Sequence, residues 1–254
     1  MGTYAVTGSA SGIGAATVKS LRSAGHEVIT LDLRDADLQA DLSTPEGRST
    51  AVHGIRERAG QGLDGLVPCA GVGPHVDPRS LIPEINYFGA VELVEGLRDL
   101  VAARRGAIVL IGSNSATMME YDATYVQALL AGDRAAATAR ANEVDGQTCY
   151  GGGKYAMTCW MRRNNSGFAG KGVRINAVAP GFTETALTEA GMQDPEYRQA
   201  MQDFVASIPL GKPGKAEDQA EAITFLLSER ASFISGSVLF VDGGHDAMLR
   251  PDRF

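Results

Sequence analysis

The chain has 254 residues, of which 44% are hydrophobic and 21% are charged, the balance of a globular protein near the upper size for one core. Asp and Glu outnumber Lys and Arg by 30 to 23, and this acidic balance excludes the basic surface that nucleic acid needs as a main partner. The three cysteines form no CxxC pair and no cluster with the four histidines, so we expect no metal and a reducing, cytoplasmic setting. No apolar run reaches about 18 residues and no secretory signal pattern opens the chain, so we expect no membrane association.

Short β-prone runs alternate with helical patterns along the whole chain. This alternation is typical of βαβ units and predicts an α/β fold, a single Rossmann-type doubly wound parallel sheet with helices on both faces. We treat residues 1–254 as one dinucleotide-binding and catalytic domain with an insertion at about 116–147. The expected strands cover 4–7, 28–33, 63–67, 107–111, 173–178 and 238–241, and the expected helices cover 15–24, 46–59, 84–103, 150–169 and 216–228.

A glycine-rich segment follows the first expected strand and opens the first helix. Gly8 can turn the chain sharply, Gly12 lets the backbone approach a pyrophosphate, and Gly14 lets the helix pack close to the sheet. A tight turn without a ligand is the alternative, but the strand before and the helix after favour a dinucleotide on the helix N-terminus. The candidate cofactor residues here are Gly8, Ser11, Gly12, Ile13 and Gly14.

Asp32 ends the second expected strand, 18 positions beyond Gly14. A carboxylate at this place can accept hydrogen bonds from the adenosine ribose hydroxyls and repels a 2′-phosphate, so we expect NAD and not NADP. Arg34 could attract that phosphate, and Asp32 could also be a polar strand end without a ligand; both alternatives stay open at this point.

Tyr150 and Lys154 lie four positions apart, so on a helix their side chains share a face. A free phenol has a pKa of about 10, too high for a base at neutral pH. An ammonium at ~4 Å contributes roughly 4 kcal/mol at an effective dielectric of ~20, which lowers the phenol pKa toward the working range of acid–base catalysis. Without further support, a surface Tyr–Lys pair is the better interpretation.

Two further polar residues accompany the Tyr–Lys pair. Ser113 follows the strand 107–111, at the sheet edge where α/β folds bind ligands, and Asn86 lies on the expected helix 84–103. With the other motifs, these residues closely resemble the short-chain dehydrogenase/reductase family. The matching elements, in family order over essentially the whole chain, are Thr7-Gly8-x-x-x-Gly12-Ile13-Gly14, Asp32, Asp41-Leu42, Cys69-Ala70-Gly71, Asn86, Ser113, Tyr150-x-x-x-Lys154 and Pro180-Gly181.

The resemblance implies an Asn–Ser–Tyr–Lys tetrad. Tyr150 would be the acid–base, Ser113 would orient the carbonyl or alcohol oxygen, Lys154 would hold the nicotinamide ribose and lower the Tyr150 pKa, and Asn86 would support a water-linked proton relay. It also implies cofactor contacts by Asp41 and Leu42 at the adenine, Ala70 and Gly71 at the ribose, and Pro180, Thr183 and Thr185 near the nicotinamide.

The sequence departs from the family pattern in three places. The run Pro68-Cys69-Ala70-Gly71 lacks an Asn that the family often shows, and Gly153 replaces a common Ser before Lys154. Ser113 and Tyr150 are separated by 37 positions, unusually many for the family, with a helical-looking run at 125–143 inside the insertion. This layout is similar to bacterial 3-alpha-hydroxysteroid dehydrogenases/carbonyl reductases, as are the motifs Asp32-Leu33-Arg34-Asp35, Asn86-Tyr87-Phe88-Gly89 and Arg250-Pro251-x-x-Phe254. Coniferyl-alcohol dehydrogenases are also similar.

We expect an NAD-dependent oxidoreductase that interconverts a bulky, largely apolar secondary alcohol and its ketone. No Arg or Lys cluster is present to hold a carboxylate or phosphate of the substrate. Alternatives are an aryl or coniferyl-type alcohol dehydrogenase, an enoyl reductase, which the simple Tyr-x-x-x-Lys spacing disfavours, and a non-catalytic NAD-sensing protein, which the intact tetrad disfavours. The residues expected to form the substrate wall, each of which could be plain core instead, are Met118, Met119, Phe182, Leu187 and Met192.

The insertion also affects which surfaces are available for the association of two chains. Many members of the family associate through the helix before the catalytic Ser and the helix carrying Tyr-x-x-x-Lys, and residues 116–147 enter between these two elements. An obstruction there leaves the helix 216–228 and the strand 238–241 for contact, so we expect a homodimer. A tetramer remains the outcome if the insertion folds aside as a substrate lid.

Overall fold

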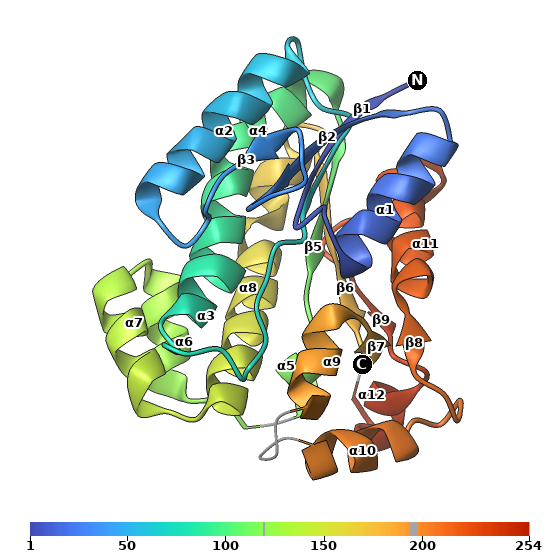
Figure 1. Cartoon of the computed structure of the whole chain (residues 1–254). Helices are drawn as coiled ribbons and strands as arrows, with labels where there is room; N and C mark the ends of the chain where they lie inside the picture. The colour runs from blue at the N-terminus through green and yellow to red at the C-terminus, as the bar shows by residue number, and fades with distance from the viewer. Residues whose placement is uncertain (119, 194–197, 254) are drawn as a thin grey trace.

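The computed structural model describes residues 1–118, 120–193 and 198–253, and its centre is a seven-stranded parallel sheet (Figure 1). The strand order is β3-β2-β1-β4-β5-β6-β9. This order reverses between β1 and β4, and α/β sheets bind ligands beyond the carboxyl ends of their strands at such a reversal. The strands are β1 (Thr3–Thr7), β2 (Glu27–Asp32), β3 (Leu38–Gln39), β4 (Gly65–Pro68), β5 (Ala107–Ile111), β6 (Arg174–Pro180) and β9 (Val238–Val241), with β7 (Thr183–Glu184) and β8 (Gly214–Lys215) forming a separate pair.

Helices cover both faces of the sheet, which confirms the expected doubly wound α/β fold. Helices α1 (Gly12–Ser23) and α11 (Ala216–Leu227) pack on one face, and α2 (Pro45–Ala59), α4 (Ala90–Arg104) and α8 (Gly146–Ala169) pack on the other. Alternate residues of β5 supply both cores: Val109 faces α1 and α11, whereas Ile108 and Leu110 face α4 and α8.

The shorter elements differ most from the expected ones. The expected helix 84–103 begins as a π-helical turn, Glu84–Gly89, that continues into α4. The helical-looking run 125–143 is two helices, because Asp133 caps a second helix by accepting the backbone N–H of Ala136. The remaining helices are α3 (Leu81–Pro83), α5 (Ser115–Met118), α6 (Ala123–Ala131), α7 (Arg134–Glu143), α9 (Ala186–Gln193), α10 (Arg198–Ala206) and α12 (His245–Leu249), with a 3-10 turn at Glu229–Ala231.

The insertion packs tightly against the helix that carries the Tyr–Lys pair. Tyr125 of α6 is fully buried, and a Cβ added at Gly152 of α8 would lie 3.1 Å from its ring. At Gly153, a Cβ would lie 3.4 Å from the Tyr125 hydroxyl oxygen. The glycines between Tyr150 and Lys154, which are poor helix formers, therefore leave room for an aromatic ring of the insertion.

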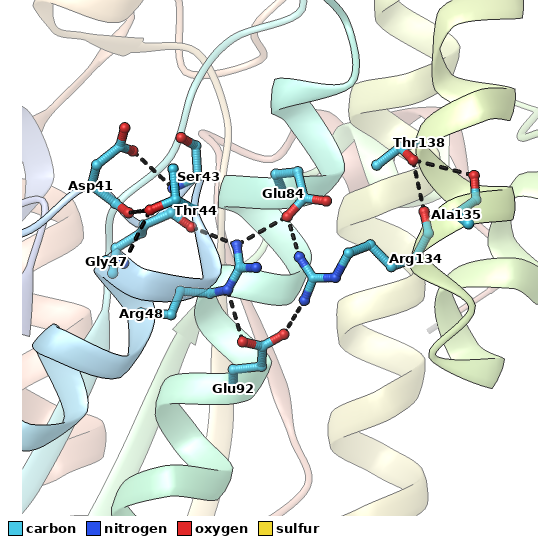
Figure 2. Close-up of polar contacts among 11 residues, drawn as sticks. Asp41, Ser43, Thr44, Gly47, Arg48, Glu84, Glu92, Arg134, Ala135 and Thr138 are labelled. Atoms are coloured by element: carbon cyan, nitrogen blue, oxygen red, sulfur yellow. Dashed lines mark hydrogen bonds and ion pairs between the residues drawn. The ribbon is translucent and has the colours of Figure 1, made fainter.

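A closed group of four charged side chains joins α7 to the body of the protein (Figure 2). Arg48 of α2, only 1% exposed, donates to Glu84 Oε2 at 2.9 Å and to Glu92 Oε2 at 2.7 Å. Arg134 of α7 pairs with the same two carboxylates and stacks over the Phe88 ring. The insertion is therefore anchored on the face of α4, not folded aside from it.

Candidate active site

The glycine-rich loop crosses from β1 to α1 in a conformation that requires glycine. Gly8 has a positive φ of 64°, and a Cβ there would lie 2.7 Å from the backbone N of Ala70. A Cβ at Gly14 would lie 2.0 Å from the carbonyl oxygen of Gly8. The loop thus folds tightly against the start of α1, whose first amides have no helical acceptor and suit a diphosphate.

Asp32 stands across this loop at the end of β2. Its Oδ2 accepts the backbone N–H of Ala10 at 2.9 Å, and its Oδ1 accepts that of Leu33 at 2.7 Å. These bonds fix the carboxylate beside the loop and leave lone pairs for further donors. The position fits the ribose-binding role that the sequence predicts.

A cleft of about 300 Å³ runs over the carboxyl ends of the central strands. It has the size of a small ligand site, with the glycine loop at one side and α8 at the other. The structure brings all the sequence-predicted cofactor residues together in its lining: Gly8, Ser11, Gly12, Ile13, Gly14, Asp32, Asp41, Leu42, Ala70, Gly71, Tyr150, Lys154, Pro180, Thr183 and Thr185.

The electrostatics of the Tyr–Lys pair differ from the expectation. Burial raises the pKa of Tyr150, opposite to the expected lowering by Lys154, and the hydrogen bond from the Ser113 side chain lowers it only in part. Lys154 Nζ lies 5.8 Å from the Tyr150 ring centroid and donates to the Ile111 carbonyl at 2.7 Å. The ammonium therefore bonds to the β5 backbone here and not to the phenol, and burial lowers the pKa of Lys154 to about 8.

Ser113 and Asn86, the other two members of the predicted tetrad, differ in their relation to the cleft. Ser113 is buried and lines the cleft just after β5, and its side chain acts to lower the pKa of Tyr150. Asn86 lies outside the described lining; its amide accepts the Val72 N–H at 2.8 Å and donates to the Val72 carbonyl at 2.9 Å. Asn86 therefore holds the loop after β4 in place, and its role in a proton relay stays a prediction.

The predicted substrate wall is only partly assembled. Leu187, in the first turn of α9, lines the cleft, but the described lining excludes Met118, Phe182 and Met192. Phe182 lies between the lining residues Gly181 and Thr183, and Met192 lies about one turn beyond Leu187 and Thr188 on α9. Met119 lies outside the described residues. The sequence analysis missed the apolar lining residues Val72 and Ile85, which only the fold brings to the cleft.

None of the described helices combines the length and apolar character needed to cross a membrane. Within the same described ranges, no group of three or more His, Cys, Asp or Glu side chains is arranged to hold a metal ion.

Together, the fold and the cleft define a dinucleotide-binding α/β protein with Ser113, Tyr150 and Lys154 at the sheet edge. A family model described as short chain dehydrogenase matches residues 3–126, and one described as enoyl-(acyl carrier protein) reductase matches residues 135–246. The chain belongs to the short-chain dehydrogenase/reductase family of oxidoreductases, as full-length similarity to characterised members also shows.

Three of these similar proteins are informative. The chain is 40% identical to the 3-alpha-hydroxysteroid dehydrogenase/carbonyl reductase of Comamonas testosteroni, over 100% of both chains. It is 32% identical to the coniferyl-alcohol dehydrogenase of Pseudomonas sp. (strain HR199 / DSM 7063), over 94% of both. The crystal structure of 3-alpha-hydroxysteroid dehydrogenase from Pseudomonas sp. B-0831 complexed with NADH superposes with a TM-score of 0.96 at 48% identity, covering 99% of this chain and 100% of that one. The subfamily resemblance predicted from the sequence is confirmed.

Proposed function

We propose that this protein is an NAD(H)-dependent oxidoreductase that interconverts a bulky, largely apolar secondary alcohol and its ketone. One observation carries the proposal: the hydroxyl-bearing residues Tyr150 and Ser113 line one cleft together with the glycine loop and Asp32. A structure 48% identical to this chain is that of a 3-alpha-hydroxysteroid dehydrogenase complexed with NADH, which supports both the cofactor and the substrate class.

The cleft suits NAD in its charges as well as in its shape. The amides of the glycine loop and α1 would receive the diphosphate, and the Asp32 carboxylate would accept the adenosine ribose hydroxyls while repelling a 2′-phosphate. Arg34, on the exposed turn after β2, is absent from the described lining. When bound, the nicotinamide supplies or receives a hydride at the carbinol carbon of the substrate.

The side chains of the protein would then move the proton. In ketone reduction, Tyr150 donates its phenolic proton to the substrate oxygen, and in alcohol oxidation it accepts the hydroxyl proton. Ser113 donates a hydrogen bond to the same oxygen. Because burial raises the pKa of Tyr150, the phenol stays protonated at neutral pH and is ready to act as the acid of reduction.

The lining supports an uncharged, apolar substrate. Lys154 is the sole cation among the described lining residues, and its ammonium is already bonded to the Ile111 carbonyl. Val72, Ile85 and Leu187 present apolar surface to the cleft. A phosphate or carboxylate on the substrate would therefore lack a counter-charge here.

A panel of steroid, bicyclic, aryl and monocyclic ketones, each assayed with NADH and with NADPH, tests this proposal. We expect NADH-dependent reduction that is fastest with the steroid and bicyclic ketones. Preference for aryl substrates would favour a coniferyl-type alcohol dehydrogenase. NADH binding without turnover of any ketone or alcohol would favour a non-catalytic sensor and contradict the proposal.

We also propose that the protein is a cytoplasmic homodimer. The free state of all three cysteines supports a reducing compartment. Strand β9 is an edge of the sheet, and it carries Leu239, which is 38% exposed, close in sequence to the fully exposed Phe233. An exposed apolar strand edge invites pairing with a second chain, whereas α7 covers the α4 face.

A further inference from the structure

The turn between β5 and α5 contains a second serine whose polar groups both point at Ser113. The Ser115 hydroxyl donates to Ser113 Oγ at 2.8 Å, and the Ser115 backbone N–H donates to the same oxygen at 3.2 Å. The Ala116 N–H donates to the Ser113 carbonyl at 3.2 Å and closes the turn. The N–H bond is an ordinary serine turn, but the hydroxyl–hydroxyl bond is an addition that the turn does not require.

This pair of bonds constrains the direction in which Ser113 can donate. A serine hydroxyl carries one hydrogen and two acceptor lone pairs, and here Ser115 occupies both lone pairs. The hydrogen of Ser113 is thereby left to point at an acceptor in the cleft. A Ser113 oxygen with an open lone pair could instead accept the hydroxyl of Tyr150 and divert the proton that the reaction needs.

We propose that Ser115 is a positioning residue that commits Ser113 to donate its hydrogen bond to the reacting oxygen of the substrate. The proposal rests on the function proposed above, because it assigns Ser113 the donor role in that reaction.

A purely structural role for the Ser115 hydroxyl finds less support. Helix α5 is held by other bonds: Thr117 Oγ1 donates to the Asn114 carbonyl at 3.0 Å and to Asp246 Oδ1 at 2.5 Å. Asp246 in turn accepts two bonds from Arg250. The helix thus has an anchor on α12 that does not involve Ser115.

A double-mutant cycle on Ser113→Ala and Ser115→Ala, with NADH and decalone as the apolar ketone, tests the inference. We expect Ser115→Ala to lower kcat/KM by about 3- to 10-fold, the usual worth of one hydrogen bond, and Ser115→Thr to restore it. Thr117→Val is the matched structural control, since it removes the α12 anchor of the same helix without touching Ser113, and it should lower kcat/KM less than Ser115→Ala does. Should Ser115→Ala fail to fold, Ser115→Cys, a weaker donor of similar size, should show the same loss.

The decisive outcome is the effect of Ser115→Ala in the Ser113→Ala background. If Ser115 acts through Ser113, the second substitution changes kcat/KM by no more than about twofold there. If Ser113→Ala is too slow to assay, the same cycle is measured as decalone affinity in the NAD⁺ complex, where no hydride transfers. An apparent Tyr150 pKa that rises in Ser115→Ala during ketone reduction would further support the proposal.

Two results would overturn the proposed role of Ser115. One is an equal loss of kcat/KM on Ser115→Ala in wild type and in Ser113→Ala, which is a structural effect. The other is no loss of kcat/KM in Ser115→Ala alone. Either result, with wild type still reducing decalone and Ser113→Ala impaired, leaves the proposed function intact. Absence of wild-type turnover with every ketone would instead contradict the proposed function itself.

Discussion

A single carboxylate, that of Asp32, should set the choice between the two nicotinamide cofactors. We predict that Asp32→Ala improves kcat/KM with NADPH relative to NADH by at least about tenfold, because a like charge beside the 2′-phosphate is removed. Both backbone N–H groups that Asp32 holds are exposed, so water can replace the carboxylate there. Asp35→Asn, which removes a neighbouring carboxylate at a backbone position that Asn tolerates, is the control and should leave the preference unchanged.

Lys154 should give NADH binding a pH dependence. Burial lowers its pKa to about 8, so the ammonium is present below that pH and is lost as the pH rises through it. If the charged form binds the cofactor ribose, the Kd for NADH is flat below pH 8 and rises above it, as fluorescence titration can measure. In Lys154→Met the Kd should be higher and independent of pH; a pH-independent Kd in wild type would contradict this role.

The insertion is fixed to the rest of the protein by the group of four charged side chains on α7, α2, α4 and the π-helical turn that leads into α4. Arg134 is one third exposed and shares Glu84 and Glu92 with the buried Arg48. We predict that Arg134→Met lowers the free energy of unfolding by about 1–2 kcal/mol. Arg48→Met should lower it by about 3–5 kcal/mol, because both carboxylates then lose their buried partner.

Urea denaturation measures both losses, and a control comes from the same helix. Arg140 of α7 pairs with Asp122 and Glu143 near the surface, so Arg140→Met should cost less than either substitution above. Equal stability of Arg48→Met and wild type would show that the four charges do not hold the insertion in place.

How much of this could be predicted from the sequence depends on the range of the contacts. The glycine loop, Asp32 and the Tyr–Lys pair follow from local spacing on predicted strands and helices, and the structure places all of them at one cleft. Other contacts join residues 14 to 50 positions apart, and no local pattern predicts them. They are the Asn86–Val72 bonds and the Arg48–Glu84–Arg134 contacts. The two-residue strand β3 likewise depends on pairing with β2, and not on its own sequence.

The pKa of Tyr150 marks a different limit of sequence reasoning. Spacing correctly placed Tyr150 and Lys154 on one helix, but it could not show where the Lys154 side chain would find its acceptor. The glycines between the two residues are poor helix formers, and no local pattern shows that Tyr125 of the insertion packs against Gly152 and Gly153.

For the whole molecule, we predict a homodimer that forms through the exposed edge strand β9. Light scattering at low micromolar concentration should give the mass of two chains, and Leu239→Arg on β9 should shift the protein to a monomer, because a charge would be buried in the interface. Leu33→Arg, at an exposed leucine at the end of β2, is the control and should leave the mass unchanged. A stable tetramer of wild type would contradict the argument that the insertion obstructs the α4 face.

Tyr150 is proposed to transfer the proton in an NAD(H)-dependent reaction, and the Tyr150→Phe variant tests this role. The substitution removes one hydroxyl and keeps the ring, so we predict that ketone reduction with NADH falls by at least about 100-fold. The Kd for NADH, measured on the same preparation, should stay within about twofold of wild type, because the ring still fills its place in the lining. Retention of most of the wild-type turnover in Tyr150→Phe would contradict the account.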